Sequence, residues 1–244
     1  VRRAAPNVKW DYLLENVATM ADFDRQEITR RTEALGSVTT VKYDAREVGV
    51  VNRPRLYWFN WELGTEEAEG AGIKLVADPG GAKTSEYIVV KEQEKVELQS
   101  AEFLDVGVRK CAPNKPFPTA VRWLPRDCPP AKPAGIEDCD DETLVRWKAS
   151  RYAMSPYMFK WENCVQTEKG EVRPPNAQER EKMHGYSPGH TDEFSESQRL
   201  CFTGNTFHCI VVARILSVWA EKRGLLCYVP TVEELWKSAG YANG

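Results

Sequence analysis

The chain has 244 residues, of which 42% are hydrophobic and 28% are charged, and its net charge is -3. This is enough apolar material for one large domain, or for one domain that carries a smaller one, and it argues against a disordered low-complexity chain. A nearly neutral, slightly acidic chain has no global nucleic-acid signature, so any such role must depend on a local patch.

No stretch approaches the roughly 20 consecutive apolar residues of a membrane-spanning helix, and the N-terminus lacks the apolar run of a signal peptide. The seven cysteines are scattered and include no Cys-x-x-Cys pair, which argues against a disulfide framework and a structural zinc site. The three histidines, His184, His190 and His208, have no metal-ligand spacing. We therefore expect a soluble, non-secreted protein with no membrane partner and no metal.

The first part of the chain is expected to alternate strands and helices. Trp10 to Leu14 is a short apolar run that ends at Glu15. Asp24 and Glu27 have the spacing of a helix cap, and Gly36 supplies the end of that helix.

Two strands are expected next, one from the alternation of Val41, Tyr43 and Ala45 and one in the aromatic-rich run from Arg53 to Trp61. Strands that alternate with helices predict an α/β fold built on a mostly parallel sheet in three layers. Residues 1–61 are assigned to this sheet domain.

Residues 62–172 differ in character. Glycines interrupt the start, prolines crowd the middle, and short strands are expected at 85–90 and 95–98. This composition predicts an irregular domain inserted between two parts of the sheet domain.

From residue 173 to 244 the pattern becomes helical again. Asn176 and Glu179 have cap spacing and open a short helix that Gly185 closes. A last helix is expected at about 207–223, ended by Gly224, with one apolar face made of Val212, Ile215, Leu216 and Trp219. We expect this face to be partly uncovered, as an aggregation liability or a docking surface.

Glu15 is the first candidate for chemistry. A carboxylate directly after a buried parallel strand lies at the carboxyl edge of the sheet, where open α/β folds bind ligands. Burial there raises the pKa of a carboxyl group and lets it hold or deliver a proton. The alternative is a simple cap at the end of a strand.

Arg53 and Arg55 are two apart in a predicted strand, so both guanidinium groups leave the same face of the sheet. Two such groups can clamp a carboxylate, a phosphate or a base carbonyl. The alternative is a surface ion-pair role.

The segment from Thr143 to Trp161 contains four basic residues and no acidic one, interleaved with aromatic rings. Basic groups that neutralise phosphates, mixed with rings that stack, are what a nucleic-acid surface requires. The alternative is a core strand pair with solvated lysines and arginines. The expected DNA contacts are Arg122, Lys148, Arg151 and Lys160.

Small polar residues from Thr203 to Thr206 precede the last expected helix. Free backbone N–H groups at a helix N-terminus can hold the polar edge of a cofactor, although a plain cap needs no ligand.

These pieces occur in a characteristic order along the chain: Glu15-Asn16-Val17, then Asn52-Arg53-Pro54-Arg55-Leu56-Tyr57-Trp58, then the irregular region, then Arg173 to Tyr186, then Gly204-Asn205-Thr206-Phe207. This order resembles the C-terminal part of a DNA cytosine-5 methyltransferase. In that family the blocks are the Glu-Asn-Val motif, the Arg-x-Arg motif, the target-recognition domain, a motif that ends in Gly-Phe-Pro, and a closing Gly-Asn-Ser motif. The run around Arg53 to Asn60 is most similar to the eukaryotic de novo enzymes.

The resemblance implies a role for each matching position. Glu15 corresponds to the carboxyl group that bonds the flipped cytosine at N3 and its amino group. Arg55 corresponds to the arginine on the cytosine O2, and Arg53 orders the pocket beside it. Asn205, Thr206 and Phe207 match the positions that approach S-adenosylmethionine.

The sequence also departs from the family pattern. At five positions in or directly after the third block the residue differs from the one in the family motif: Asn176, Lys182, His184, Tyr186 and Ser187. No cysteine follows a proline, and no Gly-x-Gly loop follows a strand at the start. The family needs both features, one for its nucleophile and one for its cofactor, so we expect this segment alone not to transfer methyl groups.

The fold expected from the resemblance is therefore a partial Rossmann-like methyltransferase sheet with an inserted irregular target-recognition domain at 62–172. The expected partners are double-stranded DNA, the missing catalytic half in cis or in trans, and further subunits of the same or another kind. The missing half is expected either before Val1 or, as in permuted plant enzymes, after Gly244. The expected location is the nucleus if the source is eukaryotic, and otherwise the cytoplasm. The alternative from another class is a non-catalytic DNA-binding or regulatory relative.

Overall fold

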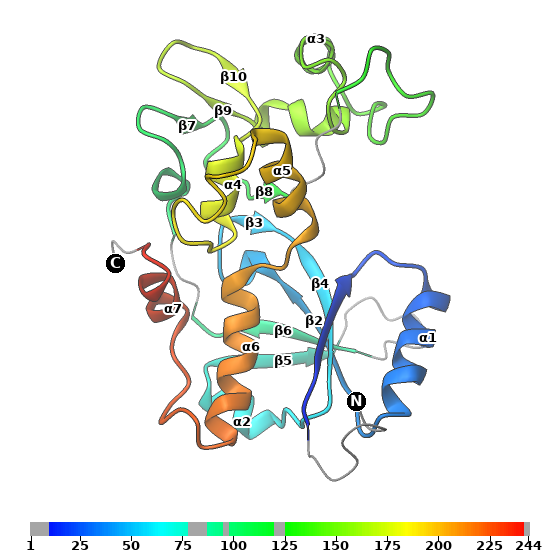
Figure 1. Cartoon of the computed structure of the whole chain (residues 1–244), viewed down its shortest axis with the longest axis vertical. Coiled ribbons are helices and arrows are strands. Elements are labelled where there is room, and N and C mark those ends of the chain that lie inside the picture. Colours follow the sequence, from blue (N-terminus) through cyan, green and yellow to red (C-terminus); the bar gives the residue numbers. More distant parts are fainter. Residues whose placement is uncertain (1–9, 78–86, 95–97, 120–124, 242–244) are drawn as a thin grey trace.

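A computed structural model describes residues 10–77, 87–94, 98–119 and 125–241 (Figure 1). Its strands are β1 (Leu13–Val17), β2 (Thr39–Asp44), β3 (Val51–Asn52), β4 (Pro54–Phe59), β5 (Ile73–Ala77), β6 (Ile88–Glu92), β7 (Arg109–Lys110), β8 (Phe117–Pro118), β9 (Val165–Gln166) and β10 (Val172–Arg173). Its α-helices are α1 (Asp22–Glu33), α2 (Thr65–Gly70), α3 (Asp141–Ala149), α4 (Ala177–Met183), α5 (Glu196–Asn205), α6 (Cys209–Lys222) and α7 (Val232–Ser238). Short 3-10 turns lie at Ala45–Glu47, Ser100–Phe103, Pro156–Phe159 and Trp161–Asn163.

The main sheet has five strands in the order β1-β4-β2-β6-β5. The α/β class expected from the sequence is confirmed, but the expected parallel direction is wrong for three of the four pairings. Only β2 and β6 run parallel. For β2 and β4 the physical reason is the short connection between them, since a parallel pair needs a crossover of a dozen or more residues.

Helices cover both faces of this sheet, which gives the three expected layers (Figure 1). On one face α1 lies against β4, where the Trp58 indole N–H donates to the Thr29 hydroxyl at 3.0 Å. On the other face the side chains of Val41, Tyr43 and Phe59 form one buried core with residues of α6 and α7.

β5 and β6 belong to this same sheet. The sheet therefore continues beyond residue 61, and the boundary expected at 62 is too early. The strand expected at 85–90 corresponds to β6, whereas most of the strand expected at 95–98 falls outside the described residues. The irregular region begins after β6 and includes α3 and the small sheet β10-β9-β7, which extend away from the main sheet in Figure 1.

The helix around α4 forms as its sequence predicts. Asn176 accepts a hydrogen bond from the Glu179 backbone N–H at 2.7 Å, and the Glu179 carboxylate accepts one from the Asn176 backbone N–H at 2.8 Å. Gly185 follows the helix with φ +79°, and a Cβ atom there would lie 2.9 Å from Ile210 Cγ1. Glycine is needed at this position both for its backbone conformation and for the close approach of α6.

The last predicted helix corresponds to α6 and ends before Gly224, as expected. Its apolar face is mostly covered: Ile215 is buried, Val212 and Trp219 are partly buried, and Leu216 remains 38% exposed. The sequence did not predict α3, α5 or α7.

α5 and α6 together span Glu196–Lys222 and are long and apolar enough, by length and composition, to cross a membrane, with a mean hydropathy of 1.3. However, the helical conformation breaks at residues 206–208, and 44% of the apolar window is buried inside the protein. These are features of a core helix.

A buried ion pair joins α6 to the sheet. Arg214 contacts Glu92 on β6 at 3.0 Å, and both side chains are almost completely inaccessible to solvent. Arg214 also donates to the carbonyl of Pro230 at 2.7 Å, and the Tyr43 hydroxyl donates to Glu92. The charges are therefore paired and their remaining polar atoms are hydrogen-bonded, which a buried pair requires.

We expect Arg214→Met to lower the free energy of unfolding by about 3–5 kcal/mol, because it leaves the Glu92 carboxylate buried without its partner. Urea denaturation measures this loss. The control is Lys237→Met, which breaks an exposed pair with Glu233 and should change stability by less than about 1 kcal/mol. Equal losses in the two variants would contradict the prediction.

Candidate functional site

The structure brings together Glu15 and Arg55, which are 40 positions apart in the sequence. Glu15 on β1 lies opposite Tyr57 on β4, and Arg55 is the diagonal neighbour on the same face. Arg55 Nε lies 2.9 Å from Glu15 Oε1, with the arginine side chain 8% exposed and the glutamate 26% exposed. The arginine is thus a buried partner of the carboxylate and not a surface residue.

The position of Glu15 corrects one expectation from the sequence. Glu15 does not follow a buried parallel strand; it lies in the middle of β1, at the edge of the sheet and antiparallel to β4. Its environment is nevertheless the one that proton chemistry requires. Burial raises the pKa of Glu15, and the charges of Arg55 and Arg53 oppose this rise.

Arg53 lies between β3 and β4 and is 2% exposed. Its backbone N–H donates to Asp44 Oδ1 at 2.8 Å. Its guanidinium Nη2 donates to the backbone carbonyl of Gly204, in the last turn of α5, and to that of Thr206, in the chain that joins α5 to α6. Burial and the neighbouring Arg55 lower the pKa of Arg53 to about 10, so it remains a cation at neutral pH.

Two buried histidines lie beside Arg53. Their rings are 5.7 Å apart, and each donates to a backbone carbonyl, His184 through Nδ1 to Arg180 and His208 through Nε2 to Met183. Burial lowers the pKa of His208 to about 3 and that of His184 well below its usual value; Arg53 contributes to both shifts. Both rings are therefore neutral at physiological pH. The two histidines add no positive charge that would repel the buried Arg53 cation.

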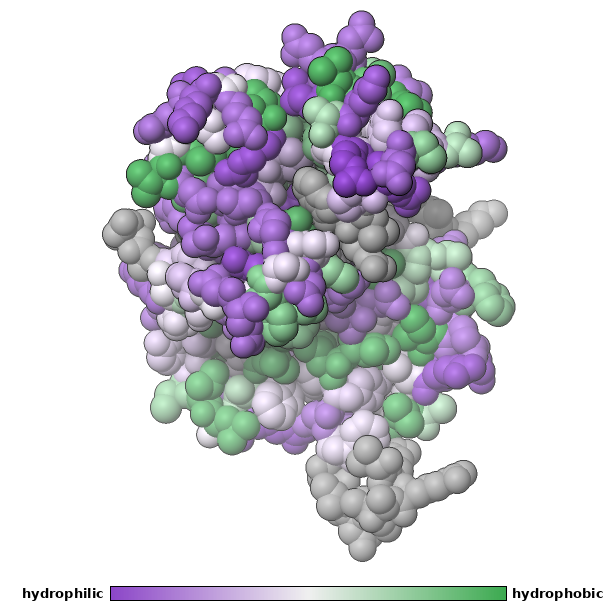
Figure 2. All heavy atoms as spheres, turned by 45° about the horizontal axis from the view of Figure 1, so that its top comes forward, coloured by the Kyte–Doolittle hydropathy of each residue, from purple (hydrophilic) through white to green (hydrophobic). Residues whose placement is uncertain are grey.

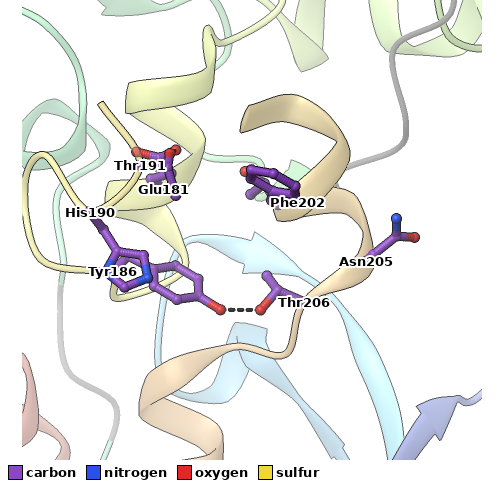
Figure 3. Close-up of a pocket in the computed structure, with 8 residues that line it drawn as sticks. Glu181, Tyr186, His190, Thr191, Phe202, Asn205 and Thr206 are labelled. Carbon is purple, nitrogen blue, oxygen red and sulfur yellow. Dashed lines mark hydrogen bonds between the residues drawn. The ribbon is translucent and has the colours of Figure 1, made fainter. Parts of the chain in front are cut away.

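The expected cofactor positions only partly coincide with a cavity. Asn205 and Thr206 line a pocket of about 370 Å³ between α4, the loop after it and α5 (Figure 3). Phe207 is 44% exposed and does not line it. The predicted helix N-terminus is wrong here, because Thr203 to Asn205 form the last turn of α5, which begins at a capping box of Ser195 and Gln198.

Thr203, which also lines the pocket, belongs to the polar run expected to hold a cofactor edge, but the other lining residues were not predicted: Glu181, Tyr186, His190, Thr191 and Phe202. They come from two helices and a loop, so their proximity depends on packing and leaves no spacing signal in the sequence. The one sequence feature that pointed to this pocket was Tyr186, which belongs to the third sequence block.

The basic segment from Thr143 to Trp161 folds as α3 and two short turns, and not as a strand pair. Its rings mostly face inward, where Trp147 and Phe159 form a small core with Met158. Trp161 is an exception, with 44% exposure. The aromatic residues therefore stabilise this part of the fold, and the expected stacking surface is reduced to one ring.

The expected DNA contacts have different surroundings. Lys148 on α3 and Arg151 just after it are exposed, and Lys160 is partly buried. Arg151 also pairs with Asp127 at 2.7 Å. Arg122 lies outside the described residues. Figure 2 shows that the face toward the end of the molecule that carries α3 is largely hydrophilic, with scattered hydrophobic residues.

The backbone after α3 is strained. Arg151, Tyr152 and Met154 have φ values of +57°, +55° and +56°, a conformation that residues with a side chain rarely adopt. The surrounding contacts hold it in place: the Trp147 indole N–H donates to the Met154 carbonyl at 3.3 Å, and its ring packs edge-on against Tyr152. The exposed Arg151 is thus presented by a fixed turn.

The chain matches no protein-family model and no curated protein. Among solved structures it is similar to the Entamoeba histolytica methyltransferase EhMeth (TM-score 0.47, 12% identity, 87% of this chain and 63% of that chain). It is also similar to the S. pombe Dnmt2 methyltransferase (TM-score 0.49, 12% identity, 89% of this chain and 70% of that chain). A third likeness is to a mutant of Spodoptera frugiperda DNMT2 (TM-score 0.47, 12% identity, 85% and 66%). The chain thus spans 63% to 70% of the length of these proteins.

We expect Arg55→Leu to raise the pKa of Glu15 further, because the effect of burial remains while the strongest opposing charge is removed. A carbon-detected NMR titration of the Glu15 carboxyl group measures this pKa. Arg31→Leu is the control, since Arg31 pairs with Glu27 on α1. An unchanged or lower Glu15 pKa in Arg55→Leu would contradict the assigned pairing.

Proposed function

We propose that this chain is part of a DNA cytosine-5 methyltransferase that transfers a methyl group from S-adenosylmethionine to C5 of a flipped cytosine. The observation that carries the proposal is the pair of Glu15 and Arg55, because the two sequence blocks that contain them meet on one face of the sheet. A carboxyl group and a guanidinium group side by side match the polar edge of cytosine, with an acceptor at O2 and N3 and a donor at the amino group.

In this mechanism Glu15 bonds cytosine N3 and the amino group. Its raised pKa favours the protonated form, which can donate to N3 as a nucleophile adds at C6. Arg55 donates to O2, and its fixed charge stabilises the negative charge that develops on the ring. The target base must leave the duplex to reach these groups.

Arg53 has a positioning role. Its bonds to the Gly204 and Thr206 carbonyls connect the Glu15 side of the sheet to the turn that contains the proposed cofactor positions Asn205, Thr206 and Phe207. Because Arg53 directly precedes β4, the strand that carries Arg55, we expect a shift of that turn to reach the cytosine pocket.

The residues of the turn fit one part of a cofactor site. Asn205 offers an amide and Thr206 a hydroxyl group beside a cavity of about 370 Å³, a size in the range of small-molecule sites. S-adenosylmethionine, when bound, supplies the methyl group. No cysteine of this chain follows a proline, so we propose that the attacking thiolate comes from a separate catalytic half, in cis or in trans.

For DNA, we propose that the irregular region grips the duplex through Lys148, Arg151 and Lys160, with Arg122 as a further contact. The exposure of Lys148 and Arg151 and the fixed turn after α3 support this role. Nuclear location in a eukaryote, or cytoplasmic location otherwise, follows from a DNA substrate.

The second candidate function is a non-catalytic DNA-binding or regulatory relative that pairs with an active enzyme. It is favoured if the full-length protein lacks a Pro-Cys motif altogether. The two functions differ in whether Glu15 matters for methyl transfer.

We expect Glu15→Gln to lower kcat/KM for methylation of a cytosine duplex by about 100-fold or more, because the amide cannot deliver a proton. The assay uses radiolabelled S-adenosylmethionine and the protein together with the half that carries the nucleophile. Glu33→Gln on the exposed side of α1 is the control. Unchanged turnover in Glu15→Gln would overturn the catalytic role, and no turnover in the unaltered protein would favour the regulatory function.

We expect Lys148→Glu/Arg151→Glu to weaken duplex binding and to flatten its salt dependence, because fewer counterions are released. Fluorescence anisotropy at several salt concentrations measures both. The control is Lys74→Glu/Lys169→Glu, which makes the same change in net charge at exposed residues elsewhere. If the affinity and the salt slope stay at the unaltered values, this patch is not the DNA surface.

A further inference from the structure

The pocket beside α5 has aromatic walls on two sides. Tyr186 and His190 stack on each other, with ring centroids 4.9 Å apart and an angle of 26° between planes. Phe202 lies across the cavity from them (Figure 3) and is 43% exposed. Phe194 contacts Phe202 edge-on at 5.1 Å and so supports its ring from the side.

Several polar groups of the pocket are already paired within the protein. Glu181 is held by Arg199 at 2.7 Å and accepts from the Thr191 hydroxyl group. Tyr186 and Thr206 share a hydrogen bond between their hydroxyl groups. The pocket therefore offers flat apolar surfaces with hydroxyl groups at the edge.

The charge of the lining disfavours a phosphate group. Glu181 is the one carboxylate among the eight lining residues, and none of them is a lysine or an arginine. Arg199 divides its charge between Glu181 and Asp192, which lies 3.0 Å away. A phosphate would meet no uncompensated positive charge here, whereas a neutral planar ring would meet two aromatic walls.

We propose that this pocket binds an unstacked nucleobase, held between Phe202 on one side and the Tyr186–His190 pair on the other. The volume of about 370 Å³ accommodates a nucleoside. Base stacking on aromatic side chains needs no charge and gives most of its energy through ring overlap. The choice of a nucleobase over other planar rings rests on the proposed function, in which the protein handles nucleic acid.

The pocket is connected to the proposed cytosine site. Thr206 contacts Tyr186 through its side chain and Arg53 through its carbonyl group. Arg53 is adjacent in the chain to the strand that carries Arg55. A base in the pocket therefore contacts the same turn that Arg53 holds.

The test uses 2-aminopurine, an adenine analogue whose fluorescence falls when it stacks. The full chain is titrated against two probes, the free riboside and a short single-stranded DNA with one central 2-aminopurine. We expect saturable quenching. Binding of the free riboside would assign the pocket to a free nucleoside or nucleoside cofactor, and binding of the oligonucleotide alone would assign it to a base of the nucleic acid.

Three variants make the test specific. Phe202→Ala should bind the probe about tenfold more weakly or worse, equivalent to about 1.4 kcal/mol, because it removes one wall. Tyr186→Phe keeps the stacking ring and should bind the probe within about threefold of the unaltered chain. Phe23→Ala, which removes a 77% exposed ring on α1, should bind as the unaltered chain does.

The absence of saturable quenching with both probes, or unaltered affinity in Phe202→Ala, would overturn the proposal. A methylation assay separates this result from the proposed methyl transfer. For this comparison the free riboside is the probe, and the unaltered chain is assayed for both binding and methylation: if the pocket binds a base, the riboside should be quenched even where no methylation is detected. A probe that fails to bind while methylation persists would reject the pocket and leave the proposed enzyme intact.

Discussion

The structure depends on the buried Arg53 cation. Its desolvation is costly and only partly offset: Nη2 donates to the backbone carbonyls of Gly204 and Thr206, whereas Nε and Nη1 are buried with no hydrogen-bond partner. Because these carbonyls come from a segment about 150 positions later in the chain, this side chain ties the start of β4 to the end of α5, beside the Arg214–Glu92 pair that ties α6 to the sheet. The neutral state of His184 and His208 permits this cation to remain buried.

The predictable parts of the fold were those with a local cause. The caps at Asn176 and Gly224 and the alternation of β2 follow from hydrogen bonds and side-chain periods within a few residues. The relative direction of two paired strands has a non-local cause, because it depends on the length of the connection between them. The short link from β2 to β4 was visible in the sequence, and its length favours the antiparallel pairing that the structure shows.

For the candidate site, sequence order identified Glu15 and Arg55, and packing brought them into contact. Sequence order did not predict that Glu15 lies in an edge strand antiparallel to β4. The exposure of a residue in such a strand depends on which strand lies beside it, and that neighbour is distant in the sequence. In the aromatic segment near α3, composition predicted a binding role where the structure shows a packing role. Its rings have the composition of a stacking surface, yet a region with few other apolar residues needs Trp147 and Phe159 for its own core.

The edge position of β1 has a further chemical consequence. Glu15 keeps 26% of its side chain accessible, and the pairing partner on one side of β1 is β4. A second strand or a bound base on the open side would remove the remaining water from the carboxyl group. Desolvation would then raise the Glu15 pKa further while also strengthening the attraction of Arg55, and these effects oppose each other. The protonation state of Glu15 therefore depends on what covers the open side of β1.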